Sequence, residues 1–144
     1  MTTDDHFGSD DDRPDLGAMA MRLGRRLIAL EEPILSRHGT SMWAYAVLTT
    51  LGERPMRAQS ALAASIGADK TRLIPVLDDL QQRGLIEREP DPADRRVRLL
   101  RLTPAGRRLQ GSIQAEIRVA EESLLGELSP ADRRAFLRGL TALS

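Results

Sequence analysis

The sequence predicts a mainly α-helical protein with one small β-hairpin. Three observations lead to this fold class: apolar residues recur at helical spacing, capping residues and glycines divide the helical stretches, and two strand-like runs flank a turn-rich segment. A length of 144 residues is typical of one domain. We therefore expect a single domain over residues 15–144, preceded by a short tail.

The tail, residues 1–14, has almost no apolar side chains. Residues 1–15 hold six aspartates and one arginine, a net charge of −5. Such a segment cannot bury enough apolar surface to offset the entropy lost on ordering, so we predict a flexible acidic tail in which His6 is a surface residue. Two roles are open for it: a solubilising segment, or a competitor of phosphate groups for the basic surface.

The first two predicted helices are long enough to build much of a core. One covers about residues 15–36, with Asp15 as a suitable N-cap and apolar residues at the spacing i, i+3, i+4 and i+7. The second begins at a cap, Thr40 or Ser41, and closes at Gly52.

Two shorter helices follow, joined by a tight turn. The third spans about residues 59–66 and stops at Gly67. Asp69 then caps a fourth helix, which ends at Gly84. Two short helices on either side of a glycine-containing turn are typical of a helix-turn-helix.

Two strand-like runs come next, Leu85–Glu89 and Val97–Leu102. The segment between them, Pro90–Asp94, is rich in proline and aspartate, as are the turns that join hairpin strands. The order helix, turn, helix, hairpin is that of a winged helix-turn-helix, which we place at about residues 40–103.

The last two predicted helices begin at Thr103-Pro104 and Ser129-Pro130, where a cap precedes a proline at the first helical position. They cover about residues 103–126 and 129–144. Together with the helix over residues 15–36, they carry more apolar face than the winged module can cover. A second copy of the chain is the simplest cover, so we predict a homodimer with these three helices at its interface.

The composition excludes several kinds of function. The absence of cysteine rules out disulfides and thiolate metal sites, and there is no glycine-rich phosphate loop or cluster of metal ligands. Adjacent carboxylates, Glu31-Glu32 and Glu121-Glu122, do not face one another along a helix. We therefore expect no enzymatic activity, no metal and no cofactor. Without a signal peptide or an apolar run long enough to span a bilayer, we expect a cytoplasmic protein with no membrane partner.

The chain as a whole is neutral, but its charges are unevenly distributed. Because residues 1–15 carry −5, residues 16–144 carry +5. The segment Arg83–Arg108 contains eight arginines against four acidic residues. A concentration of positive charge in a winged helix indicates a nucleic acid partner.

Three motifs in the winged region occur in a characteristic order: Leu80-x-x-x-Gly84-Leu85-Ile86-x-Arg88, Asp94-Arg95-Arg96 and Leu100-x-Leu102-Thr103-x-x-Gly106. In this order and spacing the chain resembles the multiple antibiotic resistance regulator (MarR) family over about residues 15–144. The resemblance implies a triangular homodimer whose two winged lobes meet successive major grooves of a pseudo-palindromic operator. It also implies a sequence-specific regulator of transcription that binds double-stranded DNA, usually a repressor released by a small phenolic or anionic ligand.

The candidates for base and phosphate contact lie at the start of the fourth helix. Its outward side carries Thr71, Pro75, Asp78 and Gln82, with Arg72 beside that side and Lys70 in the first turn. The N-terminal turn of such a helix faces base edges and phosphates, so Lys70, Thr71 and Arg72 are the main candidates. The alternative is that these are ordinary solvated residues. Members of the family often have a polar pair where this chain has Ile74-Pro75, so we expect a kink or loose start there and more apolar base readout, for example of thymine methyl groups.

At the wing, the resemblance makes Arg96 the arginine of the tip, with Arg95 and Arg98 beside it. A guanidinium is attracted by the negative potential of a narrow minor groove. Asp94 is assigned a stabilising role in the wing. The alternative is that Asp94 and Arg96 form a local pair that only stiffens the hairpin.

The family places its ligand pocket where the first and second helices approach the fifth, which makes His38, Trp43 and Tyr45 candidates for contact with a small aromatic or anionic effector. The alternative is that they are core and hinge residues. The competing function for the whole chain is a winged-helix protein-interaction module that does not bind DNA.

Overall fold

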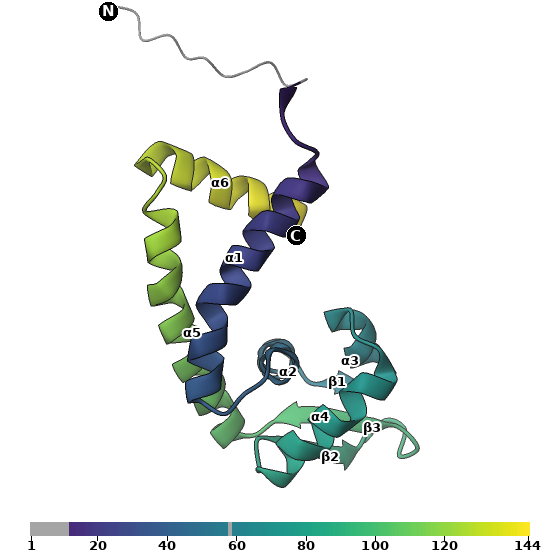
Figure 1. Ribbon diagram of the computed structural model, residues 1–144. Coiled ribbons are helices and arrows are strands. Elements are labelled where there is room, and N and C mark those ends of the chain that lie inside the picture. Colours follow the sequence, from purple (N-terminus) through teal and green to yellow (C-terminus); the bar gives the residue numbers. More distant parts are fainter. Residues whose placement is uncertain (1–11, 58) are drawn as a thin grey trace, which may run out of the picture.

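A computed structural model describes residues 12–57 and 59–144; the expected acidic tail lies largely outside these residues, as does His6. The described chain is mostly helical, with one small sheet (Figure 1). The elements, in chain order, are α1 (Leu16–Arg37), α2 (Met42–Glu53), β1 (Met56–Arg57), α3 (Gln59–Ile66), α4 (Lys70–Gln82), β2 (Ile86–Pro90), β3 (Arg98–Leu102), α5 (Pro104–Leu125) and α6 (Pro130–Leu143). The predicted fold class, mainly α with a β-hairpin, is confirmed.

Helix starts agree with the predicted caps, with one exception. Ser41 rather than Thr40 caps α2: its hydroxyl accepts a hydrogen bond from the backbone amide three residues further on. Asp15 stands at the N-cap position of α1, but its side chain makes no capping hydrogen bond. The predicted end of α2 at Gly52 is one residue short, because the helix continues to Glu53.

The sheet has three strands in the order β1-β3-β2, all antiparallel. The β2–β3 pair is the predicted hairpin, with Ile86 opposite Leu102 and Pro90 opposite Arg98. The sequence did not predict β1, because two residues cannot show the alternation by which strands are recognised. Met56 pairs with Leu100, so β1 ties the end of α2 to the wing.

Apolar side chains form two clusters. The larger lies inside the winged lobe, between α2, α3, α4 and the sheet, and includes the fully buried Leu48, Leu62, Leu77 and Leu100. The smaller joins the end of α1 to the middle of α5 through Ile34, Leu35, Ile113 and Ile117. Leu109, near the start of α5, packs against both clusters.

Thr103 explains the predicted start of α5. Its hydroxyl accepts the amide of Gly106 at 3.0 Å and donates to the carbonyl of Gly84 at 2.7 Å. Its own amide donates to the carbonyl of Leu85 at 3.1 Å. One residue therefore caps α5 and fastens it to the segment between α4 and β2.

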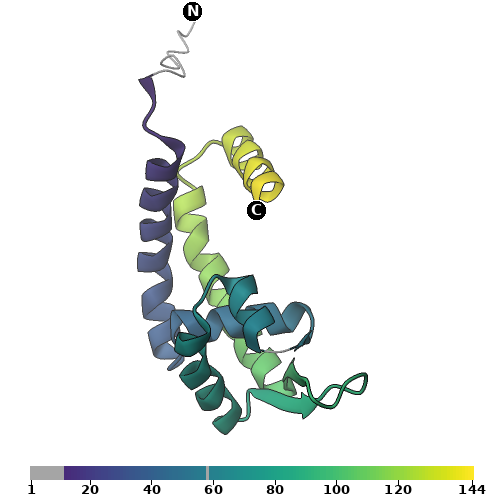
Figure 2. The same cartoon turned by 90° about the vertical axis from the view of Figure 1, so that its right-hand side faces the viewer.

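α1 and α5 lie side by side, and α6 lies at the end of the molecule remote from the sheet (Figure 1 and Figure 2). No residue of α6 is buried. Apart from Ile74 on α4, the large apolar side chains that stay exposed among the described residues lie on α1, α5, α6 or the α5–α6 loop: Leu16, Met21, Ile28, Val119, Leu128, Leu137, Leu140 and Leu143. Within the described ranges, no helix is both long and apolar enough to span a membrane.

Candidate nucleic-acid interface

The turn between α3 and α4 sets the start of the second helix. Gly67 adopts a φ of +70°, a left-handed conformation that favours glycine. The amide of Ala68 donates to the carbonyl of Ala63 at 2.9 Å, which closes α3. Asp69 then caps α4 as predicted, because its carboxylate accepts the amide of Thr71 at 3.2 Å.

α4 buries one side and exposes the other. Leu73, Leu77 and Leu80 are buried in the lobe, whereas Lys70, Thr71, Arg72 and Pro75 are exposed. The helix runs without interruption from Lys70 to Gln82, so the loose start expected at Pro75 is not present. Pro75 cannot donate the helical hydrogen bond to the carbonyl of Thr71, four residues earlier.

The acidic residues on α4 are paired with arginines. Asp78 lies 2.9 Å from Nη1 of Arg88 on β2, and Asp79 lies 3.6 Å from Nη1 of Arg83 at the end of the helix. These pairs reduce the negative charge that Asp78 and Asp79 would present to a phosphate backbone. The Asp78–Arg88 pair also links α4 to the wing.

The wing loop is held by its two aspartates. The side chain of Asp91, a buried residue, accepts the amide of Ala93 at 2.9 Å, and the amide of Asp91 donates to the carbonyl of Val97 at 2.8 Å. Asp94 accepts both the amide and the Nε of Arg96 at 3.1 Å. The backbone at the tip is therefore fixed, and the local pair considered as an alternative does form.

Pairing with Asp94 does not bury Arg96, whose side chain remains 91% exposed. Arg95 and Arg98 are exposed as well. No described residue forms an ion pair or a side-chain hydrogen bond with these two arginines, so their donors face solvent. α4 and the wing belong to the same lobe, at the end of the molecule opposite α6 (Figure 1 and Figure 2). The lobe therefore presents exposed cations from two elements.

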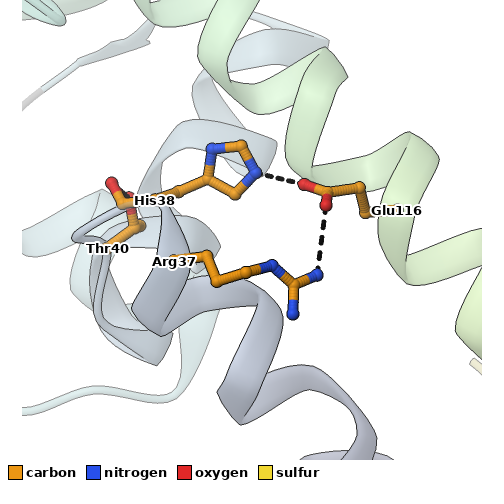
Figure 3. A network of polar contacts seen from close by, with 4 residues as sticks. All are labelled: Arg37, His38, Thr40 and Glu116. Atoms are coloured by element: carbon orange, nitrogen blue, oxygen red, sulfur yellow. Dashed lines mark hydrogen bonds and ion pairs between the residues drawn. The ribbon is translucent and has the colours of Figure 1, made fainter.

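His38 lies in a polar network between α1 and α5. Its Nε2 contacts one carboxylate oxygen of Glu116, and Arg37 donates to the other at 3.1 Å (Figure 3). The hydroxyl of Thr40 donates to the carbonyl of His38 at 3.2 Å. The hydrogen bond from His38, and then that from Arg37, lower the pKa of Glu116 below its ordinary value. Sequence reasoning missed Glu116, because only the packing of α1 on α5 brings it to His38.

Trp43 and Tyr45 leave α2 on nearly opposite sides, since they are two residues apart on a helix. Tyr45 packs against the smaller apolar cluster, and burial raises the pKa of its hydroxyl. The pKa of Glu31 on α1 is also raised, first by burial and then by the charge of Glu121 on α5. In the sequence, Glu31 and Glu121 could be compared only with their neighbours along the chain, Glu32 and Glu122. The electrostatic interaction between Glu31 on α1 and Glu121 on α5 was therefore missed.

Within residues 12–57 and 59–144, no cluster of histidine and acidic side chains could hold a metal ion. The described chain offers three candidate features for function: its cationic lobe, the network around Glu116 and the uncovered apolar surface of α1, α5 and α6.

Comparisons with known proteins agree with this arrangement. The sequence model of the MarR family matches residues 41–97. The chain is 32% identical to the transcriptional regulator HosA of Escherichia coli O111:H- over 94 residues, which cover 65% of this chain and 70% of that protein.

Two solved structures are similar over nearly the whole fold. CouR from Rhodococcus jostii RHA1, bound to p-coumaroyl-CoA, has a TM-score of 0.74 at 27% identity and covers 90% of this chain and 91% of its own. The MarR family protein Rv2887 of Mycobacterium tuberculosis, in complex with DNA, has a TM-score of 0.77 at 25% identity. The match covers 92% of this chain and 99% of the Rv2887 chain. The chain belongs to the MarR family of transcriptional regulators.

Proposed function

We propose that this chain is a homodimeric repressor that binds a pseudo-palindromic operator in double-stranded DNA and releases it when a small ligand binds. The observation that carries the proposal is the exposed set of cations on one lobe: Lys70 and Arg72 at the start of α4, with Arg95, Arg96 and Arg98 at the wing. Rv2887, which is similar in structure, is a MarR family protein in complex with DNA.

Each element has its own role in this proposal. The first turn of α4, with Lys70, Thr71 and Arg72, enters the major groove, and Pro75 lies on the same exposed side. The wing arginines approach the neighbouring minor groove, where a narrow groove attracts guanidinium groups. Asp94 holds the loop so that these arginines project from a fixed backbone.

The uncovered helices support the homodimer. α1, α5 and α6 surround a groove of about 290 Å³ lined mainly by apolar residues, including Leu23, Leu124 and Phe136. Leu137 and Leu140 on α6 border the same groove and are exposed. A lone chain would leave this surface in water, and α6 has no buried residue to hold it in place. A second copy contributing the same three helices would cover it.

The effector site is proposed at the junction of α1, α2 and α5, from His38, Trp43 and Tyr45. CouR, a relative in structure, holds p-coumaroyl-CoA, which has both an aromatic and an anionic part. In this chain an anionic group that approached His38 would compete with Glu116, which already occupies its Nε2. Titration of aromatic carboxylates, followed by Trp43 fluorescence and by release of the operator, tests the site.

The experiment for DNA binding uses the full chain. Genomic fragments captured by the purified protein are sequenced, and the enriched duplex is titrated against a scrambled duplex at several salt concentrations. We expect half-sites about one helical turn apart and a linear fall of log K with log salt. A protein-interaction module would enrich no sequence and would show no such fall. Sedimentation of the free protein at twice the mass of one chain checks the dimer.

A further inference from the structure

Ile74 is an exposed apolar residue on α4, outside the three helices that we propose for the dimer interface. The residue is 41% exposed, although its neighbour Leu73 is buried. The other large exposed apolar residues of the described chain lie on α1, α5 and α6 or on the loop before α6, on elements other than α4 (Figure 1). A second copy of the chain that covered those residues would therefore leave Ile74 without an apolar partner.

The position of Ile74 on α4 places it beside the proposed phosphate and base contacts. It follows Lys70 by four residues and Thr71 by three, so the three side chains lie along one side of the first two turns. Asp78, the next residue along that side, is held by Arg88 at 2.9 Å. A DNA groove that receives Lys70 and Thr71 therefore also receives Ile74.

The chemistry of Ile74-Pro75 restricts what can be read there. The side chain of isoleucine has no donor or acceptor, and proline has neither a polar side chain nor a backbone N–H. These two residues cannot hydrogen-bond to a base edge. The one apolar group that base pairs present in the major groove is the 5-methyl of thymine.

Resting on the proposed DNA-binding function, we propose that Ile74, supported by the ring of Pro75, is a specificity-determining residue that contacts a thymine methyl in each half-site. The residue selects a T·A pair by burying the methyl group, without a hydrogen bond. It contributes to the choice of sequence, whereas Lys70 and Arg72 contribute affinity for any duplex.

The test replaces single thymines of the captured operator with deoxyuridine, which lacks only the methyl group. For the unmodified protein we expect one thymine per half-site whose replacement weakens binding about fourfold, the value of one buried methyl-sized group. For Ile74→Ala the same replacement should have no effect. Gln81→Ala, an exposed position two turns later on α4, is the matched control and should keep the full deoxyuridine effect.

Two results would overturn the inference while leaving the DNA-binding function intact. One is salt-dependent, sequence-specific binding that no deoxyuridine replacement weakens. The other is an equal penalty in the Ile74→Ala variant, which would assign the methyl contact to another residue. Absence of any salt-dependent DNA binding would instead overturn the proposed function and this inference together.

Discussion

Replacement of Gly106 by alanine tests the junction between α5 and the winged lobe. A β-carbon at Gly106 would overlap the backbone oxygen of Leu85 and would lie 2.7 Å from Cδ1 of Leu102. The oxygen belongs to the backbone that enters β2, so it cannot move away as the end of a flexible side chain could. The start of α5 must therefore shift away from the sheet.

The expected cost follows from two opposing terms. Overpacking of this kind typically costs about 1–3 kcal/mol and occasionally more, and the shift also strains the hydrogen bonds of Thr103 to Gly84 and Gly106. Alanine regains up to about 1 kcal/mol in helix propensity over glycine. The hydrogen-bond strain and the gain in helix propensity are each about 1 kcal/mol and offset one another, so we expect a net loss of about 1–3 kcal/mol in the free energy of unfolding, roughly 5–10 °C in Tm.

Gly111→Ala is the matched control, because Gly111 lies on the same helix and a β-carbon there meets no atom within 4 Å. This variant should gain up to about 1 kcal/mol. Urea unfolding of both variants at one fixed protomer concentration gives the comparison, since dimer stability depends on concentration. If Gly106→Ala is as stable as Gly111→Ala, the close packing of α5 on Leu85 is not a constraint and the reasoning is wrong.

Three further predictions concern charge. Arg96→Ala should weaken operator binding by about 1–3 kcal/mol in an anisotropy titration at moderate salt, with an unchanged circular dichroism spectrum; unchanged affinity would refute its role. Lys70→Ala should lower the slope of log K against log salt by about one, similarly for operator and scrambled DNA, and an unaltered slope would remove Lys70 from the phosphate contacts. The carboxyls of Glu116 and Glu31 should have opposite effects on how the free energy of unfolding changes with pH. Because the pKa of Glu116 is lowered in the folded state, this carboxyl stabilises the fold at pH values above 4.5, and the stabilisation is lost as the pH falls through the lowered pKa. Because the pKa of Glu31 is raised in the folded state, its contribution to stability is present at pH values below 4.5 and is lost as the pH rises through the raised pKa. Unfolding between about pH 3 and pH 7 should show Glu116→Gln less stable than the parent at neutral pH and Glu31→Gln more stable, and parallel curves for all three proteins would contradict both assignments.

Local signals in the sequence predicted most of the fold. Caps such as Ser41, Asp69 and Thr103 and the glycine at position 67 act within a few residues, so their effect can be read from the chain itself. β1 was missed because two residues carry no periodicity. The end of α2 was placed one residue early because Gly52 was taken as a stop signal, whereas the helix passes through it.

The candidate site was less predictable than the fold. The exposure of Lys70, Thr71 and Arg72 follows from the helical period of α4, and the hairpin tip follows from its prolines and aspartates. The partners of these residues do not follow. Arg88 meets Asp78, and Glu116 meets His38, only because packing brings separate elements together, and no short-range pattern in the sequence records such contacts.

α5 belongs to both apolar clusters, and this gives it the geometry of a lever. With 22 residues it is about 33 Å long. The contact with α1 lies at Ile113 and Ile117, about 15–21 Å along the helix from Thr103, so a tilt of about 10° there moves the start of α5 by about 3 Å, close to the rise of one base-pair step, about 3.4 Å. Because Thr103 fastens the lobe to the base of this helix, such a tilt at the contact with α1 would displace α4 by about one base-pair step relative to a DNA groove.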